Sequence, residues 1–525
     1  MNTVKLIVLC CICYAQLAHL PLQAQTAGKN NSGLWVQYPV IPLLKKQPGN
    51  ALALIRLYAE AKPKVALKFI SVHLNEAAGL SFEKLTVYNN GNEPAFDTTV
   101  PGTTFIPKEG VHSIPVNINL KQGWNYIWIS ATLNEKAGLD SRPSAVVKNI
   151  VTSGNETWAV TQSAGNPEKR IGIAVRKPGE DNVHTYRIPG IIRTDKGTLV
   201  AVYDNRYHGS KDLPGDIDVG MSRSTDGGQT WEPMKVIVDM GEPHDNNGVG
   251  DPTVLFDPDT RTIWVAAVWS KGNRAIGGSG PGLSPDSTAQ LVLVSSIDDG
   301  LTWSAPHSIT PQVKDPKWHM YFNGPGGGIV MQDGTLVFPS QYWDETTRPG
   351  IPHSAIIYSK DNGKTWHSGT GARYNTTESQ VVETTPGTLM LNMRDNRGYY
   401  RSVATSSDFG KTWQEHPTSY HALPDPICMA GLIKTPVMMK GKRQEVLFFS
   451  NVNMSSREHN RKNMTIKASL DLGETWLPQN ELLLDERYGF GYSCLTRVDE
   501  HTLGILFEGI GDIIFMRVPV KDIIK

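Results

Sequence analysis

The chain has 525 residues, enough for two or more domains with large cores. Lysine plus arginine and aspartate plus glutamate number 51 each, so the formal net charge is +0. Proteins that attract nucleic acid or anionic membranes through their overall field carry a net positive charge. The balance excludes such partners on the ground of overall charge, and any anion site must be built locally.

The first residues have the pattern of a secretory signal peptide, which we place at residues 1–24. A charged start precedes an apolar run at 6–14, and Leu22-Gln23-Ala24 forms a plausible cleavage site. We therefore expect export, to a periplasm or out of the cell. A lipoprotein anchor on Cys10 is the alternative, although Leu9 stands where such a site needs a small residue. No later run of about 20 apolar residues predicts a second membrane span.

Cysteine is rare beyond the predicted signal segment. Only Cys428 and Cys494 remain there. They could form one disulfide, but two buried thiols are the simpler interpretation. In either case the chain is not a small scaffold held together by disulfides.

Short strand patterns at residues 25–155 predict a first domain that is a β-sandwich. Apolar residues alternate from Val65 to Leu74 with one slip in phase, as in a strand with a bulge. Further strands are predicted at Ser81–Tyr88 and Trp124–Thr132, separated by Asn-Gly and Pro-Gly turn signals.

This first domain is a candidate carbohydrate-binding module, because exposed tryptophans let such domains hold sugars. The candidates are Trp35, Trp124 and Trp128. The simpler interpretation, which we favour, is that these indoles fill the core of the sandwich. The polar stretch Thr152–Arg170 contains the boundary, and we place the second domain at residues 156–525.

One eight-residue phrase, Ser-x-Asp-x-Gly-x-Thr-Trp, returns five times in the second domain. The copies are Ser224–Trp231, Ser296–Trp303, Ser359–Trp366, Ser406–Trp413 and Ser469–Trp476. Their tryptophans lie 72, 63, 47 and 63 residues apart, close to or above the ~40–50 residues of a propeller blade. Each copy predicts a tight turn between two strands. A calcium loop would need acidic ligands that the copies do not share, so no metal is predicted.

Near-continuous apolar runs lie between the copies, as in sheets that are covered on both faces. They are Thr198–Asp204, Thr262–Trp269, Gln290–Ser296, Gly334–Pro339, Thr388–Met393, Glu445–Ser450 and Thr502–Phe507. Five copies imply five blades, and the flanking sequence has room for a sixth whose strands come from both chain ends. The fold prediction is all-β, a six-bladed β-propeller preceded by a β-sandwich.

Arginine recurs after these runs, which we take as the innermost strands of their blades. The arginines are Arg187, Arg206, Arg394, Arg457 and Arg461. Taken singly, each could be a solvated charge or an ion-pair partner. Equivalent positions of different blades meet at one axial mouth, however, and guanidinium groups bind carboxylates in a two-pronged geometry. The substrate is therefore expected to carry a carboxylate.

Tyr186-Arg187-Ile188-Pro189, together with the five copies, resembles the exo-sialidases (neuraminidases) of bacterial and animal type. The family consists of six-bladed propellers that remove terminal sialic acid. The resemblance covers residues 170–525. Further family signatures follow in order: Gly324-Pro325-Gly326, Thr377–Glu383, Arg394, Arg461–Ile466, Gly491-Tyr492-Ser493 and Phe507-Glu508.

The resemblance implies which residues bind the sugar. The matching positions are Arg187, Arg206, Asp251, Arg394, Arg461 and Glu508. The arginines at 187, 394 and 461 would grip the sialic acid carboxylate, and the glutamate would orient the first of them. The arginine at 206 and the aspartate at 251 would contact the 4-hydroxyl and amide side of the ring.

The resemblance implies three catalytic residues, Asp212, Glu378 and Tyr492. The anomeric carbon of sialic acid bears a carboxylate, which repels an anionic nucleophile but not a neutral phenol. Because a phenol has an ordinary pKa of ~10, Tyr492 needs Glu378 as its base. Asp212 must hold a proton for the leaving group, although arginines lower the pKa of a carboxyl. We therefore expect it on a mobile loop at 207–214, away from the three arginines.

Several assignments stay open. Asp216 and Asp218 compete with Asp212 for the acid, and Arg457 competes with Arg461. Tyr492 could instead be a core aromatic beside Phe490.

Glu383 lies five residues after Glu378, an odd offset that places it on the opposite face of a regular strand. Arg397 is expected to be an ion-pair partner. Candidates for the wall of a pocket for the substrate's N-acetyl group, equally consistent with packing between blades, are Trp269, Met320 and Trp343.

The first functional hypothesis is a retaining exo-α-sialidase that acts on sialylated glycoproteins, glycolipids or oligosaccharides through a tyrosyl intermediate. A variant would pass the sialyl group to another sugar or to the substrate's own hydroxyl. A sialoglycan-binding lectin is an alternative of another class, since it needs the arginines but not a nucleophile, a base and an acid together. A protein-binding propeller would end its blades in Trp-Asp. We expect a monomer without cofactor or metal.

Overall fold

The computed structural model describes residues 34–59, 65–244, 247–272, 274, 278–439, 441–455 and 461–525. The predicted signal peptide and Arg457 lie outside the described residues. The chain divides into two compact units, Met1–Ile171 and Gly172–Lys525. The boundary lies later than residue 155, where the first domain was predicted to end. The reason is that the strand Thr157–Gly165 pairs with strands of the first unit. No helix in the described ranges is long and apolar enough to cross a bilayer.

The first unit is built of strands and one short helix, α1 (Glu76–Ser81), within the described residues. Its strands are β1 (Leu34–Tyr38), β2 (Leu43–Lys45), β3 (Asn50–Ala59), β4 (Ala66–Leu74), β5 (Phe82–Gly91), β6 (Gly102–Phe105), β7 (Gly110–Asn119), β8 (Gly123–Leu133), β9 (Ala145–Thr152) and β10 (Thr157–Gly165). Nine of them pair in the order β6-β5-β8-β3-β1-β10-β9-β4-β7. Because β3 also packs against β9, which is not its neighbour, the strands form two facing layers, as predicted.

Two sequence expectations for the first unit can be compared with the structure. The predicted bulge is present in β4, whose pairing with β7 shifts between Leu67 and Phe69. Trp128 is buried and donates its indole N–H to the Pro94 carbonyl at 3.1 Å, so it belongs to the core. Trp35 and Trp124 remain partly exposed, with ring centroids 5.6 Å apart.

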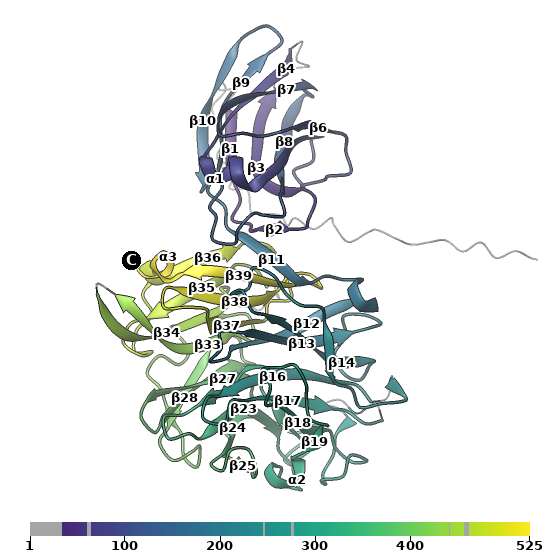
Figure 1. Cartoon of the computed structure of the whole chain (residues 1–525), viewed down its shortest axis with the longest axis vertical. Coiled ribbons are helices and arrows are strands. Elements are labelled where there is room, and N and C mark those ends of the chain that lie inside the picture. The colour runs from purple at the N-terminus through teal and green to yellow at the C-terminus, as the bar shows by residue number, and fades with distance from the viewer. Residues whose placement is uncertain are drawn as a thin grey trace, which may run out of the picture. The chain divides into compact units, whose positions relative to one another are not determined.

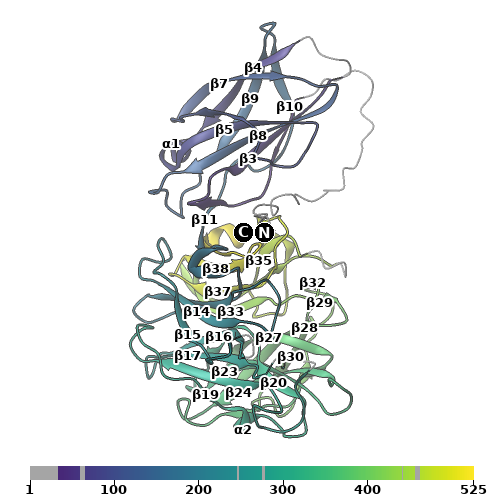
Figure 2. The same cartoon turned by 90° about the vertical axis from the view of Figure 1, so that its right-hand side faces the viewer.

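The second unit is a ring of six sheets, as predicted (Figures 1 and 2). The first three blades are β12 (Thr185–Arg193), β13 (Leu199–Arg206), β14 (Ile217–Ser224), β15 (Lys235–Val238); β16 (Val249–Asp257), β17 (Thr262–Trp269), β18 (Gln290–Ser296), β19 (His307–Ser308); and β20 (Met320–Asn323), β22 (Ile329–Val330), β23 (Leu336–Trp343), β24 (Pro352–Ser359), β25 (His367–Ser368), β26 (Arg373–Tyr374).

The last three blades are β27 (Thr376–Thr385), β28 (Thr388–Asp395), β30 (Ser402–Ser406), β31 (Gln414–Glu415); β33 (Gly431–Met439), β34 (Lys442–Val452), β35 (Met464–Ser469), β36 (Glu481–Asp485); and β37 (Ser493–Arg497), β38 (Thr502–Glu508), β39 (Ile513–Pro519), β11 (Ile171–Arg176). Shorter elements are β21 (Gly326–Gly327), β29 (Tyr399–Tyr400), β32 (Pro424–Asp425), α2 (Thr310–Val313), α3 (Val520–Ile523) and the 3-10 turns Glu180–Asn182 and Pro478–Asn480.

The ring closes between the two ends of the second unit. The outer strand of the sixth blade is β11, which pairs with β39 near the C-terminus, drawn blue beside yellow in Figure 1. This is the closure expected when a blade takes strands from both chain ends.

The apolar runs read as innermost strands are in fact mostly the second strands of their blades. The innermost strands are those that pack on one another around the axis, such as β12 against β16 and β37, and β33 against β27 and β37. Second strands such as β13 are buried along their whole length, which gives them the continuous apolar character. Because the pairing is antiparallel, the end of a second strand lies beside the start of the first, as Asp204 lies beside Arg187. The arginines therefore still gather at one edge.

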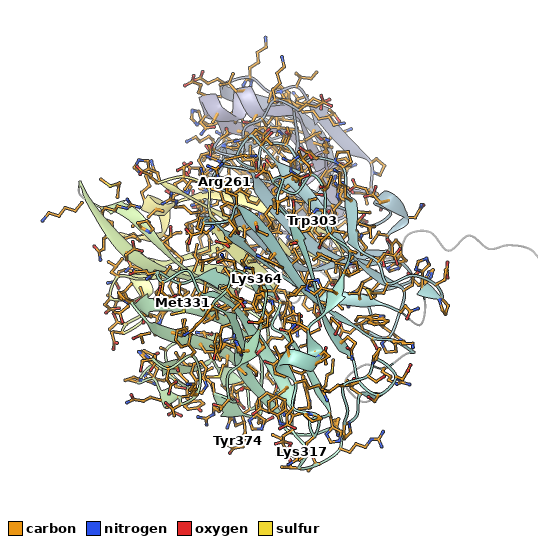
Figure 3. All side chains as sticks on the ribbon, turned by 60° about the horizontal axis from the view of Figure 1, so that its bottom comes forward. Arg261, Trp303, Lys317, Met331, Lys364 and Tyr374 are labelled. Carbon is orange, nitrogen blue, oxygen red and sulfur yellow. The ribbon has the colours of Figure 1, made fainter. Side chains whose placement is uncertain are left out.

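Each repeated phrase joins the third strand of its blade to the fourth, at the edge opposite to the arginines. In the third copy the Asp361 carboxylate accepts from the Thr365 N–H at 2.9 Å and from the Thr365 hydroxyl at 2.6 Å. Trp366 packs under its own turn and donates to the Gly363 carbonyl at 3.1 Å. Figure 3 labels Trp303 and Lys364, from the second and third copies. The phrases are structural turns and take no part in the site.

Candidate active site

The phenol of Tyr492 lies between a carboxylate and a guanidinium group. Tyr492 precedes β37, Glu378 comes from β27 and Arg394 from the end of β28. The hydroxyl donates to Glu378 Oε1 at 2.5 Å and accepts from Arg394 Nη1 at 2.9 Å. Arg394 also pairs with the other oxygen of Glu378. Burial, and then the charge of Glu378, raise the pKa of Tyr492 well above its ordinary value, so the phenol is protonated in the free protein.

Arg187 is held against the phenol by Glu508. Arg187 Nε and Nη2 donate to the two oxygens of Glu508 at 3.0 and 3.3 Å. Glu508, which ends β38 and is 2 % exposed, also accepts from the backbone N–H groups of Ile188 and Tyr492 at 2.8 and 2.9 Å. The guanidinium lies 4.6 Å from the centroid of the Phe490 ring and 5.3 Å from that of Tyr492. One carboxylate therefore fixes a guanidinium and the backbone of the phenol together.

Arg461 approaches Tyr492 from the fifth blade. Its Nη1 donates to the Phe490 carbonyl at 2.6 Å, and its guanidinium carbon lies 5.6 Å from the centroid of the Tyr492 ring. Arg187, Arg394 and Arg461 thus come from three blades and all contact Tyr492, which is the gathering that the sequence predicted. Arg457, the competing residue, lies outside the described residues.

Asp212 lies between Arg206 and Arg187, whereas the sequence analysis expected it away from the triad to which Arg187 belongs. Its Oδ1 accepts from Arg206 Nη1 at 2.6 Å and lies 3.6 Å from Arg187 Nη1, while its side chain is 80 % exposed. Crowding by protein raises the pKa of Asp212, but Arg206 and then Arg187 outweigh it, so the pKa falls below its ordinary value. The carboxylate is charged in the free protein.

Asp204 is a site residue that the sequence analysis missed. It accepts from Arg206 Nη2 at 2.8 Å and from the Asp251 N–H at 2.8 Å, and it is 1 % exposed. Burial raises its pKa to about 6, against the pull of Arg206. The signal available was its place two residues before Arg206, at the mouth end of an apolar run. Phe490 was also missed, and only its nearness to Tyr492 pointed to it.

Asp251 carries a second unusual carboxyl. Burial, and then the charge of Asp204, raise its pKa well above the ordinary value. The Asn323 amide donates to the Asp251 carbonyl at 2.5 Å, which holds the backbone at this point. Asp251 therefore lies next to the pair formed by Arg206 and Asp204, as expected. Its carboxyl holds a proton more tightly than an exposed carboxyl does.

Irregularities in three innermost strands aim side chains into the mouth. Strand pairing shifts after Arg187 in β12, after Gly250 in β16 and after Thr376 in β27. Ile188 and Asp251 have positive φ values of 58° and 54°. A bulge bends its strand and redirects a side chain, and bulges recur beside active sites. The sequence shows none of these shifts.

The structure also places the competing residues. Asp216 pairs with His208 at 3.1 Å, and Asp218 accepts from the Tyr207 hydroxyl at 3.1 Å, so neither contacts the arginines that hold Asp212.

Glu383 accepts from the N–H groups of Gln332 and Gly387, both at 2.8 Å, and faces away from the mouth as its odd offset predicted. Arg397 pairs with Asp395 at 2.6 Å, as expected.

An apolar cluster lies beside the loop that carries Asp212. Met320, Phe322 and Trp343 pack together, and Leu213 packs against them. Two of the three candidate wall residues therefore lie next to the Asp212 loop, whereas Trp269 packs into the core between the first two blades.

The two cysteines are free and buried, which agrees with the expectation of two thiols. Burial raises the pKa of each thiol to about 11. Cys428 lies 3.9 Å from the Phe490 carbonyl and so packs behind the phenol.

The comparisons with known proteins agree with this geometry. Residues 32–156 match the N-terminal domain of BNR-repeat neuraminidase, and residues 188–483 match the BNR repeat-like domain. A sialidase of Bacteroides fragilis (strain YCH46) is 43% identical over 527 residues, 94% of this chain and 95% of that protein. The solved Hadza microbial sialidase Hz136 has a TM-score of 0.87 and 40% identity, covering 94% of this chain and 100% of that one.

A more distant structure shares the fold alone. Trypanosoma rangeli sialidase in complex with 2,3-difluorosialic acid, described as a covalent intermediate, has a TM-score of 0.53 and 22% identity, covering 70% of this chain and 56% of that one. Fold, site and relatives together define the class as a glycoside hydrolase, an exo-α-sialidase. The chain belongs to the BNR-repeat neuraminidase family.

Proposed function

We propose that the chain is a retaining exo-α-sialidase that cleaves terminal α-linked sialic acid through a covalent intermediate on Tyr492. The observation that carries the proposal is the position of the Tyr492 hydroxyl, 2.5 Å from Glu378 and 2.9 Å from Arg394. A sialoglycan-binding protein needs guanidinium groups, but it has no use for a phenol paired with a base. That pairing supports an enzyme and speaks against a lectin.

Arg187, Arg394 and Arg461 bind the sialic acid carboxylate in this proposal. Guanidinium groups suit a carboxylate because two parallel N–H bonds fit its two oxygens. Glu508 keeps the Arg187 guanidinium in place, at 3.0 and 3.3 Å. Arg206 and Asp251 would contact the 4-hydroxyl and amide side of the ring.

In the first chemical step the Tyr492 oxygen forms a bond to the anomeric carbon as its proton passes to Glu378. The bond from that carbon to the leaving sugar breaks, and Asp212 gives its proton to the departing oxygen. In the second step water attacks the same carbon and the bond from that carbon to the Tyr492 oxygen breaks. Asp212 takes a proton from the attacking water, and Glu378 returns a proton to the Tyr492 oxygen. Two inversions give net retention. The high pKa of Tyr492 supports the need for a base so close to it.

Asp212 must gain a proton before it can act as the acid. In the free protein Arg206 and Arg187 lower its pKa. A bound sialic acid would draw Arg187 to its own carboxylate and cover the exposed face of Asp212, and both effects raise the pKa of that carboxyl. The acid would therefore form only when substrate is present.

The test uses sialylated oligosaccharides that differ in linkage, with the released sugar followed by NMR and mass spectrometry. Free α-sialic acid as the first product supports the proposal. An anhydro sugar or a new sialoside would identify transfer to the substrate's own hydroxyl or to another sugar. Binding without any release would identify a lectin and overturn the proposal.

We also propose that the chain is exported, on the basis of the signal-peptide pattern at residues 1–24. N-terminal sequencing of the protein recovered from cell fractions tests this. Recovery of a mature chain that begins near residue 25 outside the cytoplasm is expected, and an unprocessed cytoplasmic chain would contradict it.

A further inference from the structure

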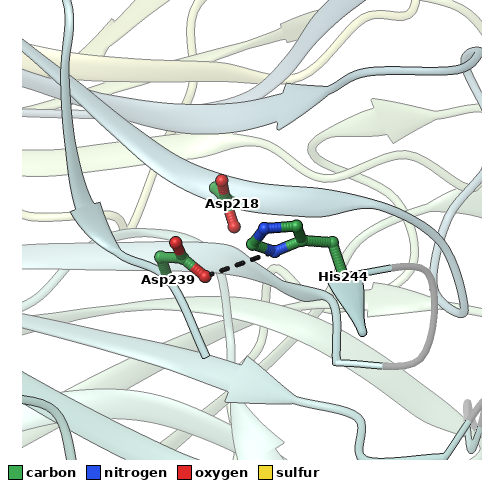
Figure 4. Close-up of side chains that lie close together, drawn as sticks. All are labelled: Asp218, Asp239 and His244. Atoms are coloured by element: carbon green, nitrogen blue, oxygen red, sulfur yellow. Dashed lines mark ion pairs between the residues drawn. The ribbon is translucent and has the colours of Figure 1, made fainter. Parts of the chain in front are cut away.

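Three side chains with metal-binding donor atoms lie together on the first blade, outside the active site. They are Asp218 at the start of β14, Asp239 just after β15, and His244 in the segment that follows. One donor atom of each lies within 4.8 Å of the other two. Figure 4 shows both carboxylates near the imidazole. Neighbouring strands bring the aspartates together, because Val219 pairs with Val238.

The Asp218 carboxylate is buried with few polar partners. It is 8 % exposed, and its one hydrogen bond within the described residues is the bond from the Tyr207 hydroxyl to Oδ2. Within the described residues it forms no ion pair with a lysine or arginine, and its charged neighbours include Asp239, Asp216 and His244. A buried carboxylate beside a second one is costly unless a cation offsets both.

We propose that Asp218, Asp239 and His244 bind one divalent transition-metal ion, of which Zn²⁺ is the best fit. An imidazole nitrogen with two carboxylate oxygens suits zinc, whereas calcium and magnesium prefer oxygen ligands alone. Three protein ligands and a water complete a four-coordinate zinc site. The ion takes no part in the chemical steps proposed for the active site.

The site is connected to the loop that carries Asp212. The Tyr207 hydroxyl bonds to Asp218, and Tyr207 lies five residues before Asp212 in the chain. Residues that hydrogen-bond to a metal-bound carboxylate orient it, and the bound carboxylate in turn fixes their positions. An ion on Asp218 would therefore fix Tyr207 and, with it, one end of the segment 207–214.

A metal-free explanation exists for the same cluster. His244 Nδ1 lies 3.6 Å from Asp239 Oδ1, and its Nε2 lies 3.2 Å from Glu242 Oε1. A protonated imidazole between Asp239 and Glu242 would form an ordinary ion-pair group on the surface.

The test is calorimetric titration of Zn²⁺ into the full chain after chelator treatment, with Mn²⁺ and Ca²⁺ as comparison ions. One saturable site is expected, tighter for Zn²⁺ than for the other two ions. Loss of an outer-shell partner weakens metal affinity by about 10–100-fold, so Asp239→Asn and His244→Gln should each weaken the tightest site by at least about tenfold. Both residues are at least partly exposed, so the variants should fold.

The matched control is His208→Gln, because His208 also pairs with an aspartate on this blade but lies outside the cluster. Its affinity for Zn²⁺ should equal that of the unmodified chain. Visible absorption of added Co²⁺ gives a second readout, expected in the control and lost in His244→Gln. The proposal is overturned by absence of a saturable site, or by equal Zn²⁺ affinity in the control and in both cluster variants.

Discussion

Glu508→Gln tests how much of the site depends on one buried carboxylate. Glu508 accepts four hydrogen bonds, two on each oxygen, from Arg187, Ile188 and Tyr492. Glutamine keeps the shape but offers one acceptor oxygen. Whichever way the amide turns, two of the four donors then face an NH₂ group, and the Arg187 charge loses its buried carboxylate partner.

The magnitude follows from the burial of this pair. An unsatisfied buried donor costs about 1–3 kcal/mol, and removing one partner of a buried ion pair costs about 3–5 kcal/mol. The two effects overlap, so we expect the free energy of unfolding to fall by about 3–5 kcal/mol. Arg187 is no longer fixed for a carboxylate, so affinity for a non-cleavable sialic acid analogue should fall by about tenfold or more, which corresponds to ~1.4 kcal/mol.

Urea unfolding gives the stability and calorimetry gives the affinity. The matched control is Glu383→Gln, which alters another buried glutamate that holds the Gln332 and Gly387 N–H groups away from the mouth. The control should lose stability and keep its affinity for the analogue. The reasoning is refuted if Glu508→Gln unfolds like the unmodified chain, or if both variants lose affinity equally.

Three further predictions concern the phenol, the acid and the turns. Tyr492→Phe should lower turnover of a sialoside by at least about 10³-fold while the analogue still binds, and preserved turnover would contradict this. Asp212→Asn should lose about 10²–10⁴-fold on sialyl oligosaccharides but much less on aryl sialosides with acidic phenols, which leave without a proton; equal losses would rule out an acid role. Asp361→Ala should lower the melting temperature at neutral pH. Because its hydrogen bonds to Thr365 lower the pKa of Asp361 from 3.8 to about 2, this stabilisation is present above pH 3.8 and lost as pH falls through about 2, so melting curves of variant and parent should converge there.

The fold could be predicted because its signals are local and repeated. The five phrases form turns whose hydrogen bonds are made within eight residues. These turns can therefore be predicted without knowing how distant segments pack. Which strand lines the axis was not predictable in this way. Hydrophobicity reports burial on both faces, and second strands such as β13 are buried as fully as any. Their assignment as innermost strands was therefore wrong, while the edge at which the arginines gather was right.

The site was predictable where a motif carries it and not where backbone geometry does. Arg187, Arg394, Arg461 and Tyr492 come together as the family resemblance implied. The bulges that aim Arg187, Asp251 and Glu378 depend on strand pairing between distant segments, which a linear pattern does not record.

The ionisation of two site residues depends on electrostatics that the sequence does not show. Asp212 lies against Arg187 and Arg206, although it was expected away from Arg187. Burial and then Glu378 raise the pKa of Tyr492, and they outweigh Arg394 and Arg461, which lower it. The relative weight of burial and charge depends on distances that the sequence does not contain.

The central claim is that Tyr492 attacks the sugar, and covalent trapping tests it most directly. The protein is incubated with 2,3-difluorosialic acid, digested, and the modified peptide is sequenced by mass spectrometry. The account predicts a single adduct on the Tyr492 oxygen, absent from Tyr492→Phe. An adduct on Glu378 or Asp212, in a protein that turns over sialosides, would contradict it.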